Sequence, residues 1–172
     1  MASMEPLRTY EYLCLARGKV LDATRALDAA GYARTFPIGL GSLARTLTHI
    51  LMCEWYYVER MQRREVPPYE RWQFRDEEPP GLAELEEEWG RQAERTRAAI
   101  RGVRDWGERI EYRGDDDATR PMVYAPSAGD IFTQLVLHEV HHRAQAMNML
   151  RHLGVTLGDL DYNALMYERR PG

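Results

Sequence analysis

Four of the five histidines in the chain lie in one stretch, LHEVHHRAQAMNMLRHLG, residues 137–154. Within it, HEVHH matches the HExxH pattern of zinc peptidases, in which two histidines bind the metal and the glutamate is the general base. The same spacing also serves other metal sites, because a helix places residues i and i+4 on one face. The remaining sequence must decide which chemistry this stretch supports.

A helical wheel separates the four histidines. At about 100° per residue, the helix predicted here has a broad apolar arc of aliphatic side chains, phenylalanine and methionine. His142 lies within that arc and His138 at its border, whereas His141 and His152 lie on the polar side. We therefore expect His138 and His142 to face the protein interior and the other two to face solvent.

A third metal ligand must come from elsewhere in the chain. The one remaining histidine is His49, which lies at the edge of the apolar face of another predicted helix. Three imidazoles would leave coordination positions open for water or substrate, as in reactive metal sites. Cys53, one helical turn after His49, is an alternative ligand. Such a site would accept nickel, copper or zinc, so the sequence does not choose the metal.

Three polar residues beside these histidines have open roles. Glu139 projects toward the apolar arc, so we expect it to be buried and to form a salt bridge with Arg143, four residues later. Glu54 is placed similarly and is expected to pair with an arginine of a neighbouring helix. Gln145 lies close to the line of the two inward histidines. It would either orient a ligand or bound water, or form an interhelical hydrogen bond.

The elements that must position these residues are helices. Apolar spacing and helix-breaking residues predict four helical segments, at residues 5–30, 42–64, 82–105 and 127–153. Ser42 is a predicted N-cap, and Ser127 with Asp130 resembles a capping box. Residues 106–127 contain two short extended runs and predict a small hairpin or an irregular crossover. The fold class is therefore all-α, an antiparallel four-helix bundle formed by a single domain spanning 1–172.

Composition excludes several classes of function. The net charge of −4 and the pI near 5.8 give no general attraction to nucleic acid. No apolar run of about 18 residues and no signal peptide is visible, so we expect neither membrane insertion nor secretion. Two cysteines, Cys14 and Cys53, do not form a disulfide framework, which favours a cytoplasmic location.

The chain also resembles a known family. FPIGLGSLARTLTHILMCEWYY around His49, the later HEVHHRAQ, and the closing GVTLGDLDYNALMYERR are similar to the DinB family. The resemblance covers essentially the whole chain. It implies a four-helix bundle, often a homodimer, with nickel or zinc at a triad that falls here on His49, His138 and His142.

Some relatives in that family use a small thiol cofactor in transfer or isomerisation. We therefore expect a metal-dependent thiol transferase or hydrolase acting on a small-molecule substrate, with zinc or nickel and a low-molecular-weight thiol as cosubstrate. The alternative is a non-catalytic, metal-stabilised dimeric binding module. A zinc peptidase is disfavoured, because no sheet is predicted before the motif and Gln145 and Asn148 stand where metzincins have a glycine and a third histidine.

Overall fold

The computed structural model describes residues 5–114 and 122–170. Four long helices form the bundle, as expected: α1 (Pro6–Arg25), α3 (Leu43–Met61), α4 (Leu82–Gly102) and α5 (Ala128–His152). In cyclic order, α1 packs against α4, α4 against α3, α3 against α5, and α5 against α1. The all-α fold class is confirmed.

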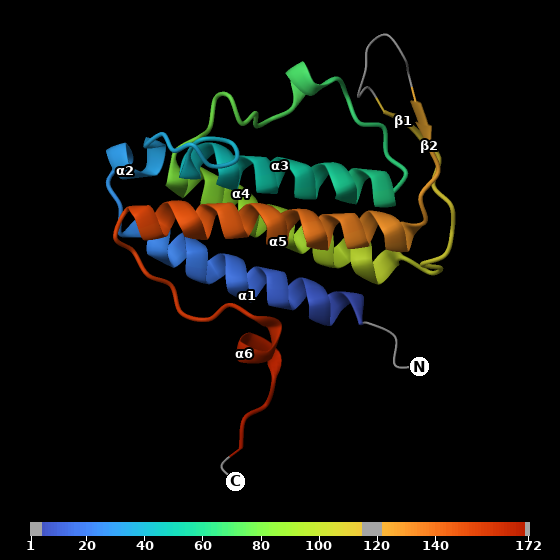
Figure 1. Ribbon diagram of the computed structural model, residues 1–172. Helices are drawn as coiled ribbons and strands as arrows, with labels where there is room; N and C mark the ends of the chain where they lie inside the picture. Colours follow the sequence, from blue (N-terminus) through green and yellow to red (C-terminus); the bar gives the residue numbers. More distant parts are fainter. Residues whose placement is uncertain (1–4, 115–121, 171–172) are drawn as a thin grey trace.

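A single long crossover sets the helix directions. Residues 62–81 carry the chain back along the bundle from the end of α3 to the start of α4 (Figure 1). This segment includes a short 3₁₀ helix, Tyr69–Arg71. As a result, α3 and α4 run in the same direction, and α5 runs antiparallel to α3. The two helices that carry the histidines are therefore antiparallel neighbours.

Side-chain caps begin α3 and α5 where the sequence indicates. Ser42 accepts a hydrogen bond from the backbone N–H of Arg45 at the start of α3, and Ser127 and Asp130 form the reciprocal capping box of α5. The prediction of one helix over residues 5–30 is wrong at its end. Asp28 accepts a hydrogen bond from the backbone N–H of Gly31 at 2.7 Å, which ends α1 early and caps a separate helix, α2 (Ala29–Ala33).

The core consists of two apolar clusters with a polar layer between them. One cluster includes Leu47 and Met149, and the other includes Val58 and Leu135. On α3 and on α5, the buried carboxylates lie between the residues of the two clusters in sequence. Charged groups therefore cross the middle of the bundle, at the level of the histidines.

The connection from α4 to α5 contains the predicted hairpin. Strands β1 (Tyr112–Gly114) and β2 (Met122–Tyr124) pair antiparallel, with Tyr112 opposite Tyr124. The turn between them lies outside the described residues. A short helix, α6 (Tyr162–Met166), follows α5 and packs against α1. Within the described ranges, no helix combines the length and apolar character that crossing a membrane requires.

Candidate metal centre

The predicted ligands meet where α3 packs against α5. The Nε2 atoms of His49 and His138 are 3.2 Å apart, and Cys53 Sγ is 3.6 Å from His49 Nε2. One ligand atom from each of these three residues lies within 4.8 Å of the other two. This grouping of two imidazoles and a thiol could hold a metal ion.

His142 lies against the same cluster. Its ring centroid is 4.7 Å from that of His49 and 4.4 Å from that of His138. Its Nδ1 is 3.0 Å from Gln145 Oε1. Because an amide oxygen can only accept, Nδ1 carries the proton and the lone pair of His142 resides on Nε2. The three histidines selected by the helical wheel are thus neighbours in space, and Cys53 is a fourth.

Asp76 fixes the proton on His49 in the same way. This buried carboxylate, from the 62–81 crossover, lies 2.8 Å from His49 Nδ1 through Oδ2. The Nδ1–H donates to the carboxylate, which leaves a lone pair on Nε2, the atom that faces His138 and Cys53. Imidazole nitrogens and a thiol sulfur are donors that zinc and nickel both accept. The residues present therefore fit such an ion.

The candidate ligands differ in protonation state in the metal-free protein. Burial, reinforced by repulsion from the rings of His142 and His49, lowers the pKa of His138 to about 3, and burial also lowers the pKa of His142. Both rings are neutral near pH 7, which is the form that binds metals. Burial, with repulsion from Asp76, raises the pKa of Cys53 to about 12. The neutral imidazoles can bind a metal without losing a proton, whereas Cys53 would release its proton on binding, a step that the metal itself promotes.

Glu139 is buried, as predicted, but Arg143 is not its main partner. Arg17 of α1 donates to both Glu139 oxygens, at 2.5 and 3.2 Å, whereas the nearest Arg143 nitrogen is 3.9 Å away. Arg143 donates instead to the hydroxyl of Tyr12 at 2.6 Å. Spacing along one helix cannot detect an arginine on another helix. Because Arg17 occupies the carboxylate, Glu139 is not placed as the general base of a peptidase.

Arg17 also holds the second buried carboxylate. It donates to Glu54 at 2.7 Å, so Glu54 does pair with an arginine of another helix, although α1 lies diagonally across the bundle from α3. Tyr10 and Thr96 donate to the other Glu54 oxygen at 2.5 and 2.6 Å. Glu54 directly follows Cys53, and Glu139 directly follows His138. One guanidinium therefore links the two helices from which the candidate ligands project.

The loop before α3 closes against Gln145. Gly39 has a φ of +48°, and a Cβ at this position would lie 2.1 Å from Gln145 Oε1. Glycine at this position therefore leaves room for the amide that bonds His142. The other end of the same amide lies 3.0 Å from Nε2 of His141, which is exposed, as is His152. Both solvent-facing expectations are confirmed.

An aromatic side chain lines the cluster on the α3 side. The ring of Tyr57 lies edge-on to His138, with centroids 5.7 Å apart. Gln134, one turn before His138 on α5, donates to the Tyr57 hydroxyl at 3.4 Å. Both side chains flank the histidines. They are placed to contact a molecule that approaches the cluster.

The four-helix fold and the histidine cluster between α3 and α5 place the chain in the class of small helical-bundle proteins with a possible metal site. A comparison with protein-family models matches residues 2–171 to the DinB family, and the chain belongs to that family. A comparison with curated proteins found no match.

Proposed function

We propose that this DinB-family protein binds one zinc or nickel ion through His49, His138 and His142 and uses it to transform a small molecule. Thiol-dependent transfer is the first candidate reaction and hydrolysis the second. The observation that carries the proposal is the meeting of His49 Nε2 and His138 Nε2 at 3.2 Å, with His142 alongside. The lowered pKa values of His138 and His142 keep these two rings neutral and ready to bind.

The bound ion would supply Lewis acidity, which activates a water or a thiol at neutral pH. The protein's own contribution is orientation. Asp76 and Gln145 keep the Nδ1 protons of His49 and His142 in place, and Tyr57 borders the approach to His138. A low-molecular-weight thiol is the proposed cosubstrate, as the family resemblance of the sequence implies.

Metal content tests this ligand set. Protein loaded with zinc or nickel and then desalted should hold one ion per chain in the wild type and in the Cys53→Ser variant. His142→Ala should lose it, because two protein ligands seldom hold such an ion tightly. His141→Ala, which alters an exposed neighbour, is the matched control and should keep full occupancy. Equal metal in wild type and His142→Ala, or loss in Cys53→Ser alone, would contradict the histidine triad.

A non-catalytic metal-binding module is the second candidate. One observation favours it: Glu54 and Glu139, the carboxylates adjacent to the candidate ligands, are both engaged by Arg17 and are not free to move protons. A panel of thiol and ester substrates separates the two functions. Turnover by the metal-loaded wild type that is lost in His142→Ala supports the enzyme. Retained metal without any turnover supports the module.

We further propose that the protein acts in the cytoplasm as a homodimer. Leu137 and Val140 of α5 are 61% and 38% exposed, and a partner chain would cover them. The same two side chains lie on the helix that carries His138 and His142.

A further inference from the structure

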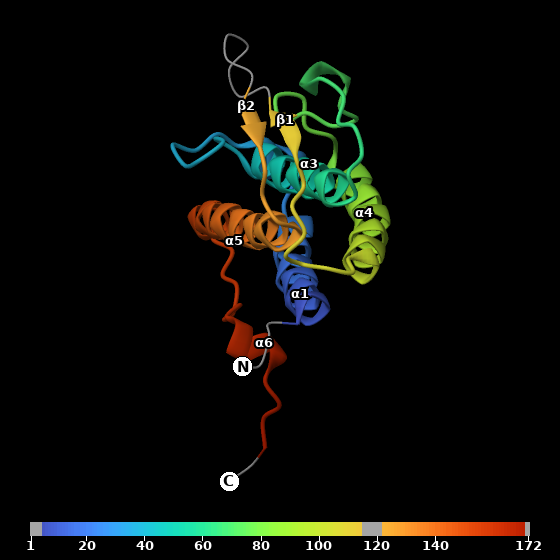
Figure 2. The ribbon, with the colours of Figure 1, turned by 90° about the vertical axis from the view of Figure 1, so that its right-hand side faces the viewer.

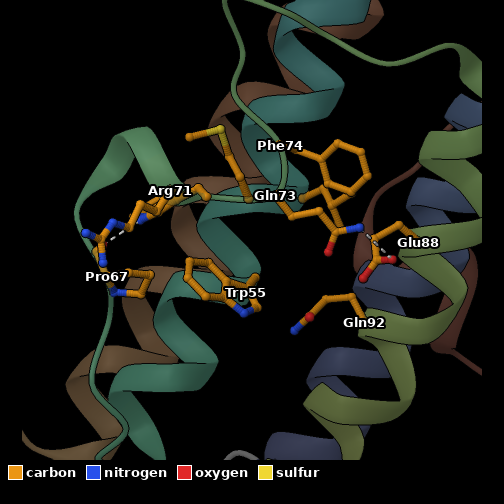
Figure 3. Close-up of a pocket in the computed structure, with 10 residues that line it drawn as sticks. Trp55, Pro67, Arg71, Gln73, Phe74, Glu88 and Gln92 are labelled. Carbon is orange, nitrogen blue, oxygen red and sulfur yellow. Dashed lines mark hydrogen bonds between the residues drawn. The ribbon is translucent and has the colours of Figure 1, made fainter.

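A second candidate binding site lies on the other side of α3 from the metal centre. A cavity of about 220 Å³ opens between α3, the 62–81 crossover and α4 (Figure 3). Its walls include Met52 and Trp55 of α3, Trp72 and Phe74 of the crossover, and Gln92 of α4. His49, Cys53, His138 and His142 do not line it, so it is distinct from the metal centre.

The aromatic side chains in the cavity wall favour a ligand that contains a ring. Trp55 and Trp72 meet edge to face with centroids 5.1 Å apart, and Phe74 faces the cavity from the same crossover. Aromatic walls of this kind favour flat apolar groups. The volume lies below the range of roughly 300–1,000 Å³ typical of sites for drug-sized ligands. It therefore suits a ligand with a single ring.

The inner wall is polar but carries no unpaired charge. Glu88 is 5% exposed and accepts hydrogen bonds from Arg91 at 2.8 Å and from Arg95 at 3.3 Å. Gln92 is 1% exposed, and its Nε2 donates to Thr96 at 3.2 Å. Figure 3 shows the Gln92 amide extending from α4 toward Trp55. A cationic ligand would find the one carboxylate in this wall already neutralised.

Among the residues that line the cavity, the charged side chain without an ion-pair partner is an arginine. Arg71, in the crossover, is exposed and lines the cavity on the side of Pro67, away from Glu88 (Figure 3). Among the described residues, none forms an ion pair or hydrogen bond with its guanidinium. An unpaired arginine beside an apolar cavity is suited to a carboxylate, which it can bind through two parallel hydrogen bonds.

We propose that this cavity binds a small ring-bearing carboxylate, with the ring between Trp55, Trp72 and Phe74 and the carboxylate at Arg71. The site goes beyond the proposed metal chemistry and does not require it. The two sites nevertheless share the crossover, because Phe74 is two residues before Asp76, the partner of His49. A bound ring packed on Phe74 would restrain the segment that orients a candidate metal ligand.

Three probes that differ mainly in charge test the proposal: phenylacetate, its neutral isostere phenylacetamide, and 2-phenylethylammonium. Calorimetric titration of the wild type should show one saturable site for phenylacetate. Phenylacetamide should bind about three- to fivefold more weakly, the effect expected for one exposed charge pair, and the ammonium more weakly still. In NMR spectra, the indole N–H signals of Trp55 and Trp72 should shift, and that of Trp106 should not.

Variants of the protein identify the side chain that binds the carboxylate. Arg71→Gln should lower phenylacetate affinity to that of phenylacetamide and leave phenylacetamide unchanged. Arg169→Gln, the same charge change at an exposed residue in the C-terminal segment, should alter neither. His142→Ala should bind phenylacetate like the wild type. The proposal is overturned if phenylacetate does not saturate, if it and phenylacetamide bind equally, or if His142→Ala rather than Arg71→Gln weakens binding. The last result would place the carboxylate at the metal centre.

Discussion

Two side chains outside the histidine cluster decide which ring nitrogens carry protons. Asp76 accepts from His49 Nδ1, and Gln145 accepts from His142 Nδ1, so both rings direct a lone pair from Nε2. Neither Asp76 nor Gln145 needs to contact a metal in order to affect metal binding. Each one fixes a tautomer and a ring orientation that an isolated histidine would have to adopt at a cost in entropy.

Asp76→Ala should therefore weaken metal binding without removing a proposed ligand. We expect a loss of about 10- to 100-fold in zinc or nickel affinity, the usual effect of losing such a partner. Competition with a chromophoric chelator measures it. Glu77→Ala, at the next residue, is exposed and serves as the control. Unchanged affinity in Asp76→Ala would show that His49 does not depend on this carboxylate.

Sequence reasoning reached the histidines but not these partners. Helical periodicity places His138 and His142 on the inner face, and His49 is the one histidine left for a third position. Asp76 stands in a loop beside Glu77 and Glu78, and no local pattern separates the three acids. Only the path of the crossover brings Asp76, and neither neighbour, against α3.

At the scale of helices, Arg17 joins α1 to both α3 and α5. Its guanidinium lies between Glu54 and Glu139, and all three side chains are at most 7% exposed. The residues just before the two carboxylates, Cys53 and His138, belong to the histidine cluster. The buried ion pairs and the candidate metal centre therefore lie at the same level of the bundle, on opposite sides of the α3–α5 contact.

Arg17→Met should destabilise the bundle strongly. It leaves two buried carboxylates facing each other without their main cation, and removing one partner of a buried pair typically costs about 3–5 kcal/mol. Urea unfolding followed by circular dichroism measures the loss. Adding Glu139→Gln to Arg17→Met should recover part of it, because one uncompensated charge is then removed.

Arg25→Met is the matched control on the same helix. Arg25 is 55% exposed and pairs with Asp22 and Glu86 at the surface, so its loss should change stability little. Equal unfolding free energies for the two methionine variants would contradict the role assigned to Arg17.

The helices themselves were largely predictable, since caps and apolar spacing are local. Ser42, Ser127 and Asp130 begin α3 and α5 as their sequence indicates. The features that the sequence did not predict depend on tertiary contacts or on local hydrogen bonds that compete with the helix. Asp28 divides the first predicted helix through its own side chain, and Arg17 reaches carboxylates 37 and 122 residues away along the chain.

For the whole molecule, the main open prediction is association. The proposed homodimer buries Leu137, which is 61% exposed in the single chain. Light scattering should give the mass of two 20.0 kDa chains for the wild type and of one chain for Leu137→Glu. Val123→Glu, an equally exposed apolar residue on the hairpin, should remain a dimer. A wild type with the mass of one chain would contradict the proposal.

The most direct test of the three-histidine centre is X-ray absorption at the metal edge of zinc- or nickel-loaded protein. The proposed ligand set predicts an imidazole pattern with nitrogen or oxygen neighbours, at about 2.0–2.1 Å for zinc, and no sulfur. A sulfur shell, at about 2.3 Å for zinc, would instead identify Cys53 as a ligand and contradict the triad of His49, His138 and His142.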